Sequence, residues 1–151
     1  MADETLGTIL LVEDESADVQ LIRRAFSVAG VLNPIAHAAN AQEAMAYLSG
    51  VGGSFPTPIL ILLDLGLPGM TGFQLMEWLR SRKALRRIPV VVLTNDPESS
   101  SINSAYDLGA NSYLIKPGTI EGVQRVVDSL RDYWLSLNEP PRLALAKDRA
   151  S

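Results

Sequence analysis

The amino-acid sequence predicts an α/β fold: a doubly wound, five-stranded parallel sheet of order 2-1-3-4-5 with helices on both faces. Three observations predict it. Short apolar runs alternate with segments of helical periodicity, which is the pattern of repeated βα units. The apolar runs are nearly continuous rather than alternating, as in strands that helices bury on both faces. Right-handed crossovers between such units favour this strand order.

The expected strands are short and apolar. In chain order they are residues 8–12, 34–38, 59–63, 89–93 and 112–115. The run at 59–63 is the most apolar, so we expect it to be the central strand. The run at 34–38 is the weakest and carries His37, which has no partner nearby in the sequence. We interpret this histidine as structural or solvent-facing.

The expected helices are recognised by their apolar spacing and by their ends. In chain order they are residues 16–29, 40–48, 73–82, 96–108 and 119–137. Asn40 with Glu43 is typical of a capping box. Asp96, followed by a proline, predicts the start of the fourth helix, and Gly109 predicts its end. Thr119 is expected to cap the last helix.

Composition narrows the class of protein. A length of 151 residues fits one domain, and we expect it to span residues 1–137, with 138–151 as a tail. The net charge of -4 argues against nucleic-acid binding, and the lack of cysteine excludes disulfides and thiol chemistry. The apolar runs are far shorter than the roughly 20 residues of a membrane helix. We therefore expect a soluble, cytoplasmic protein with no signal peptide.

Four of the expected strands lead into polar residues that suit one kind of chemistry. Glu13 and Asp14 follow the first strand, Asp64 the third, Thr94 the fourth and Lys116 the fifth. Because the carboxyl ends of parallel strands meet at one edge of the sheet, these residues should gather there. Carboxylates are hard-oxygen ligands for Mg²⁺, and a hydroxyl and an ammonium group stabilise phosphoryl oxygens. The pattern predicts a phosphoryl-transfer site.

The order and spacing of these residues, together with Pro117 after the lysine, resemble the receiver domain of bacterial two-component response regulators. The resemblance covers most of the chain and implies the flavodoxin-like receiver fold. It also implies a signalling protein rather than an enzyme, which accepts a phosphoryl group from a sensor histidine kinase. With no effector domain expected after residue 137, we expect a stand-alone receiver.

The resemblance assigns roles to the acidic residues. Asp64 corresponds to the phosphoacceptor, whose carboxylate oxygen attacks the phosphoryl group. Asp14 and Asp64, with the backbone carbonyl of Gly66 and with water, would hold one Mg²⁺ ion. Glu13 would contribute through a water molecule or by fixing Asp14.

The resemblance also assigns the cationic and switching residues. Lys116 would pair with a phosphoryl oxygen, and Thr94 would donate a hydrogen bond to another. The peptide bond before Pro117 is often cis in receivers. Tyr113 occupies the position of an aromatic switch residue that turns inward as the hydroxyl of Thr94 moves to the phosphoryl group. Plain packing with its hydroxyl in water is the alternative for Tyr113.

The end of the last expected helix carries more apolar surface than its own core requires. It contains Tyr133, Trp134, Leu135 and Leu137, which resemble the C-terminal cluster of small regulators that pair with bacterial phytochrome histidine kinases. We therefore expect a homodimer through the C-terminal segment, with the tail as a candidate dimerisation arm. An aromatic plug on the protein's own core is the alternative.

Two positions depart from common receivers. Gly66 leaves the site open, and Asp96 either positions water or caps a helix.

Two other functions compete with that of a receiver. A Mg²⁺-dependent hydrolase with an aspartyl-phosphate intermediate needs a second aspartate where Gly66 stands. A nucleotide- or flavin-binding module needs a glycine-rich turn after the first strand, where the sequence reads EDESAD.

Overall fold

The computed structural model describes residues 6–51, 53 and 55–141. Five parallel strands form one sheet in the order β2-β1-β3-β4-β5, as predicted. The strands are β1 Thr8–Val12, β2 Ile35–Ala38, β3 Pro58–Leu63, β4 Val90–Thr94 and β5 Ser112–Ile115. The helices are α1 Ser16–Val28, α2 Ala41–Ser49, α3 Gly72–Ser81, α4 Ser99–Asp107 and α5 Ile120–Asp132, followed by a π-helix at Tyr133–Leu137.

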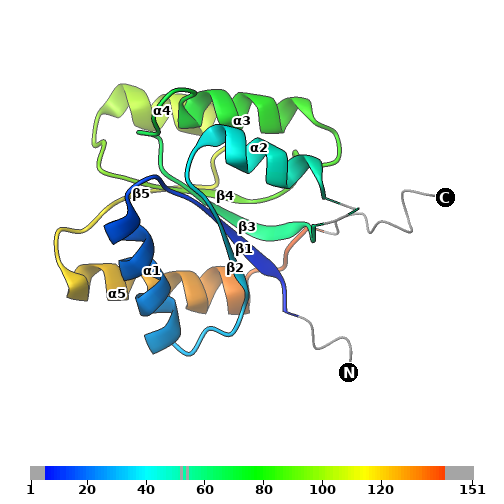
Figure 1. Cartoon of the computed structure of the whole chain (residues 1–151). Coiled ribbons are helices and arrows are strands. Elements are labelled where there is room, and N and C mark those ends of the chain that lie inside the picture. The colour runs from blue at the N-terminus through cyan, green and yellow to red at the C-terminus, as the bar shows by residue number, and fades with distance from the viewer. Residues whose placement is uncertain (1–5, 52, 54, 142–151) are drawn as a thin grey trace.

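Helices cover both faces of the sheet. In Figure 1, α2, α3 and α4 lie over one face, and α1 and α5 lie over the other. Successive strand residues point to opposite faces, so each strand serves both cores. In β1, Leu10 and Val12 belong to the core under α2 and α3, whereas Ile9 and Leu11 belong to the core on α1 and α5. This double burial explains the nearly continuous apolar runs.

Local side-chain contacts set most of the helix starts. The Asn40 side chain accepts a hydrogen bond from the Glu43 N–H at 2.8 Å, so the predicted cap of α2 is present. The start of α4 differs from the prediction. Asp96 accepts from the Glu98 N–H at 2.9 Å and closes a turn before the helix, which begins only at Ser99.

The last helix changes its winding near its end. Thr119 caps α5 as predicted by accepting from the Gly122 N–H at 3.0 Å. Regular α-helix ends at Asp132, however, and the Asn138 N–H bonds the Tyr133 carbonyl at 2.6 Å in the π-helical turn. The predicted helix to Leu137 is therefore correct in extent and wrong in type over its last turn.

Most of the predicted tail lies outside the described residues. Within the part of the chain that the structure describes, no helix combines the length and apolar character needed to cross a membrane.

Candidate functional site

The polar residues that follow the strands meet at the carboxyl edge of the sheet. They line an open pocket of about 430 Å³, whose walls include Asp14, Asp64, Gly66, Thr94 and Lys116. Strand register explains the convergence, because Val12 pairs with Leu63, Leu63 pairs with Val92, and Thr94 pairs with Ile115. β1, β3, β4 and β5 thus each deliver their last residue, or one of the next two, to the same edge.

Asp64 stands at the centre of the pocket. Its Oδ1 accepts hydrogen bonds from the Thr94 hydroxyl at 2.8 Å and from the Gly66 N–H at 3.1 Å. Its Oδ2 lies 3.0 Å from the Lys116 ammonium. Burial opposes ionisation, but the bonds from Gly66, Lys116 and Thr94 together outweigh it and hold the pKa of Asp64 below its usual value. Asp64 is therefore a carboxylate at neutral pH.

The backbone of Asp64 is fixed from two sides. Its N–H donates to the Val12 carbonyl at 3.0 Å, which ties it to β1. On the other side, α3 begins at Gly72, where a Cβ would stand only 2.8 Å from the Asp64 carbonyl oxygen and from the Leu65 Cα. A side chain at that position would push the helix away, so glycine allows α3 to start directly against the site.

Glu13 is a buried acid rather than an open ligand. Its two carboxylate oxygens meet the Lys116 ammonium at 2.6 Å and the Glu15 N–H at 3.1 Å. Burial raises the pKa of Glu13 to about 7, although both of these contacts favour the ionised form. The backbone carbonyl of Glu13 accepts a hydrogen bond of 2.7 Å from Nε2 of His37. The histidine thus has a structural partner that the sequence did not reveal.

The acidic residues fit a divalent cation. Glu13, Asp14 and Asp64 each offer one carboxylate oxygen, and these atoms lie within 4.8 Å of one another. Three hard-oxygen donors suit Mg²⁺ or Mn²⁺. Asp14 and Asp64 line the open pocket, whereas Glu13 is not among its lining residues, which favours Asp14 and Asp64 as the direct ligands. The role of the Gly66 carbonyl stays a prediction.

Lys116 has a partner that sequence reasoning missed. Besides Glu13 and Asp64, its ammonium contacts Asp18 of α1 at 2.9 Å. Burial works against the charge, but the bonds to these carboxylates outweigh it and raise the pKa of Lys116 above its usual value. An acid in the first turn of a helix is favoured by the helix dipole alone, so nothing in the sequence points specifically to this contact. The bond to Pro117 is trans, unlike the cis bond that the resemblance implied.

Tyr113 links β5 to the loop that follows Thr94. Its hydroxyl donates to the Asp96 backbone carbonyl at 2.6 Å. The ring is half-buried and packs against the core under α3. This is more than a ring with its hydroxyl in water, and it places Tyr113 in contact with the segment that a switch at Thr94 would move. The switching role itself stays a prediction.

Comparison with known proteins identifies the family. The family model for the response regulator receiver domain matches residues 9–128. The chain belongs to this family. The receiver domain is a phosphoacceptor signalling domain rather than a classical enzyme, and the hydrolase and nucleotide-binding alternatives are set aside. Receiver domains pair with sensor histidine kinases and contain a divalent metal site.

Individual relatives come from different signalling settings. The probable methanogenesis regulatory protein FilR2 of Methanothrix harundinacea is 40% identical, over 88% of this chain and 86% of its own. Response regulator Rcp1 of Synechocystis is 33% identical over 89% and 95% of the two chains, and its Mn²⁺-bound crystal structure superposes with a TM-score of 0.82. The phosphorylated cyanobacterial phytochrome response regulator RcpA is 35% identical, with a TM-score of 0.84 over 91% of this chain and 99% of RcpA.

Proposed function

We propose that this receiver accepts a phosphoryl group on Asp64 from the phosphohistidine of a sensor histidine kinase. The observation that carries the proposal is the convergence on one carboxylate of a hydroxyl, an ammonium group and two further acids. Asp64 contacts Thr94 at 2.8 Å and Lys116 at 3.0 Å, and the acidic cluster stands beside it. The 430 Å³ pocket leaves this carboxylate open to a donor.

The transfer step makes one bond and breaks one. A carboxylate oxygen of Asp64 forms a bond to phosphorus, the phosphorus–nitrogen bond of the phosphohistidine breaks, and the imidazole nitrogen keeps the electron pair. The ammonium of Lys116 offsets negative charge on the transferred group, and the Thr94 hydroxyl donates to one of its oxygens. Both groups are already within hydrogen-bonding distance of the acceptor.

Asp14 and Asp64 would hold one Mg²⁺ ion, with the Gly66 carbonyl and Glu13 in supporting roles. The ion supplies positive charge that reduces the repulsion between the acceptor and an anionic donor. This assignment rests on the grouping of the carboxylate oxygens within 4.8 Å, and the Mn²⁺-bound structure of Rcp1 supports it.

Signalling would follow from a change at Thr94. In this proposal, the hydroxyl of Thr94 moves with the phosphoryl group and Tyr113 follows the loop that it contacts through Asp96. The face formed by α4, β5 and α5 would then present a different surface to a partner.

The acceptor is tested by Asp64→Asn. The wild-type protein should become phosphorylated by acetyl phosphate with Mg²⁺, giving a product that acid and base both hydrolyse. The variant should not be labelled, because an amide oxygen is a poor nucleophile. Asp107→Asn, at an exposed acid of α4, is the matched control and should be labelled like the wild type. Equal labelling of Asp64→Asn would remove Asp64 as the acceptor.

For the cognate kinase, we propose a phytochrome-type histidine kinase. The description of RcpA as a phytochrome response regulator supports this, while the name of FilR2 points to another input. Phosphotransfer from an autophosphorylated bacteriophytochrome kinase should outpace transfer from an unrelated histidine kinase. Equal rates from both donors would argue against the pairing. We also propose a cytoplasmic homodimer that assembles through the C-terminal segment.

A further inference from the structure

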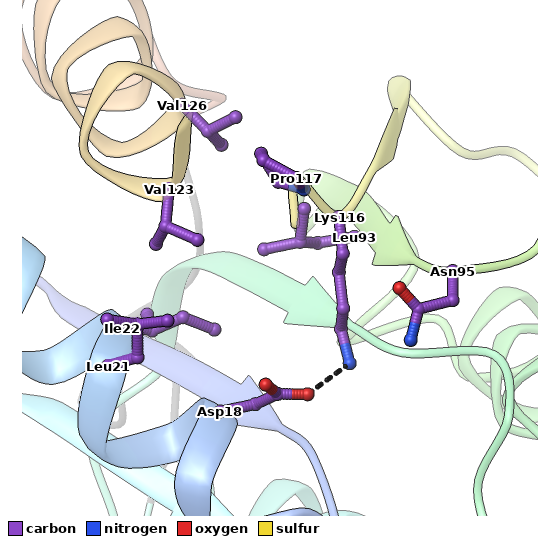
Figure 2. Close-up of a pocket in the computed structure, with 9 residues that line it drawn as sticks. All are labelled: Asp18, Leu21, Ile22, Leu93, Asn95, Lys116, Pro117, Val123 and Val126. Carbon is purple, nitrogen blue, oxygen red and sulfur yellow. Dashed lines mark hydrogen bonds and ion pairs between the residues drawn. The ribbon is translucent and has the colours of Figure 1, made fainter. Parts of the chain in front are cut away.

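Asp18 makes a contact with the site that the proposed chemistry does not use. Asp18 lies in the first turn of α1, and its carboxylate lies 2.9 Å from the Lys116 ammonium. Figure 2 shows the Lys116 side chain passing Leu93 and Asn95 to reach Asp18. The two charged groups and Asn95 line the polar part of a cavity of about 70 Å³, and the rest of its lining is apolar, mostly side chains of α1 and α5.

The ammonium has no hydrogen left over for a further acceptor. A lysine ammonium carries three N–H donors. Here three carboxylates take them, at 2.6 Å from Glu13, 2.9 Å from Asp18 and 3.0 Å from Asp64. To bind the Lys116 ammonium, a phosphoryl oxygen on Asp64 must therefore replace one of these three carboxylates.

Burial separates the roles of Glu13 and Asp18. The side chain of Glu13 is 2% exposed and meets the ammonium from the protein interior, away from water. The side chain of Asp18 is 35% exposed, so water replaces the ammonium there at low cost. Of the three carboxylates, Asp18 is the one whose contact with Lys116 costs least to break.

The position of Asp18 is well defined by its helix. The Gln124 side chain of α5 donates to the Ala25 carbonyl at 2.9 Å, and the Arg131 side chain donates to the Ala29 carbonyl at 3.1 Å. These bonds tie the C-terminal end of α1 to α5, and Val19 and Ile22, near Asp18, pack in the core between the two helices. Asp18 is thus presented to Lys116 from a fixed element rather than from a loop.

We propose that Asp18 is a positioning residue that restrains Lys116 and opposes accumulation of the phosphoryl group on Asp64. The proposal rests on the proposed function, since it concerns the same acceptor. Two effects of the Asp18 carboxylate both disfavour the phosphorylated state. Asp18 competes for the ammonium, and its negative charge repels the incoming anion. Loss of the Asp18 charge therefore favours the phosphorylated state.

The test compares wild type, Asp18→Asn and Asp18→Glu. One readout is the affinity for beryllofluoride with Mg²⁺, which occupies the place of the phosphoryl group. The other is the rate of Asp64 phosphorylation by acetyl phosphate, which needs no kinase. A partly exposed ion pair predicts about two- to fivefold tighter beryllofluoride binding in Asp18→Asn. Asp18→Glu should return toward the wild-type value, because it restores the charge on the same helix face.

A variant of a second acid, Glu15, distinguishes the effect of the direct Asp18–Lys116 contact from the effect of removing a negative charge near the pocket. Glu15→Gln removes the same charge from an exposed residue at the pocket mouth, and Lys116 has no described ion pair with Glu15. It should change beryllofluoride affinity less than Asp18→Asn does. An equal gain in both variants, or no gain in Asp18→Asn, overturns the restraint. Failure of the wild type to bind beryllofluoride or to be labelled on Asp64 overturns the proposed function itself.

Discussion

The acidic site and the C-terminal segment contrast in how their side chains are satisfied. At the site, Glu13, Asp64 and Lys116 are nearly buried and contact one another. In the segment, Tyr133 is 51% exposed and Leu137 is 76% exposed. The site groups find their partners within the chain. The segment leaves apolar surface that nothing in the described residues covers.

The segment itself divides into two halves. Trp134 and Leu135 pack against the core between α1 and α5, so for them the aromatic plug on the protein's own core is the correct interpretation. Tyr133 stands edge-on to Trp134 with ring centroids 5.1 Å apart and faces outward with Leu137. Of the four apolar residues that the sequence indicated as a partner surface, only two are therefore exposed. The proposed dimer rests on Tyr133 and Leu137.

The largest expected effect is at the centre of the site. Lys116→Ala should slow phosphorylation by acetyl phosphate by about 10²-fold or more, because the transferred group loses its fixed positive charge. The initial rate of labelling, measured with saturating Mg²⁺, checks this. Lys83→Ala, which removes an exposed lysine after α3, is the matched control. A fall of less than threefold in Lys116→Ala would show that the ammonium is not part of the transfer machinery.

The buried acid should make stability depend on pH. The pKa of Glu13 rises from 4.5 to about 7 on folding, so the folded state favours the neutral acid. This contribution to stability is complete below pH 4.5 and is lost as pH rises to about 7. Metal-free Glu13→Gln should therefore be more stable than wild type at pH 8 by up to about 3 kcal/mol. At pH 4.5 the two proteins should be nearly equal.

Urea unfolding in chelator-containing buffer at the two pH values measures this difference. Asp64 does not interfere, because its pKa is lowered and its contribution is lost only at more acidic pH. A stability gap that stays constant between the two conditions would mean that Glu13 does not titrate on folding.

The outward half of the C-terminal segment should control assembly. We expect a dimer at micromolar concentration that Tyr133→Ser with Leu137→Ser weakens by about tenfold, because the interface loses its apolar anchors. Sedimentation equilibrium measures the dissociation constant. Leu32→Ser removes an equally exposed apolar side chain, 81% exposed before β2, and should have no effect. A monomeric wild type would end the dimer proposal.

The smallest expected effect concerns the start of α5, which joins the two regions. Thr119→Ala removes the cap bond of 3.0 Å to the Gly122 N–H and should lower the unfolding free energy by about 1 kcal/mol. Phosphorylation by acetyl phosphate should stay within twofold of wild type, since Thr119 lies outside the pocket. Thermal unfolding and the labelling rate measure the two effects. A large loss of labelling would show that the cap also orders the Lys116 loop.

Local patterns were enough for the fold because its signals repeat. Apolar runs of strand length marked all five strands to within about two residues, and the caps at Asn40 and Thr119 are present. Asp96 misled because an aspartate followed by proline suits both a helix cap and the turn before a helix. The final π-helical turn also had no signal in the spacing of Tyr133 to Leu137.

The sequence by itself determined the sheet order, the edge where the polar residues meet and the family, because each follows from residues that are close in the chain or repeat along it. Only the tertiary structure decided the pairings across the site. Asp18 and Lys116 are 98 residues apart, and His37 on β2 bonds the backbone of Glu13, which follows the neighbouring strand β1. Contacts between distant segments depend on side-chain directions that spacing does not encode. The division of the C-terminal segment into a packed half and an exposed half has the same cause.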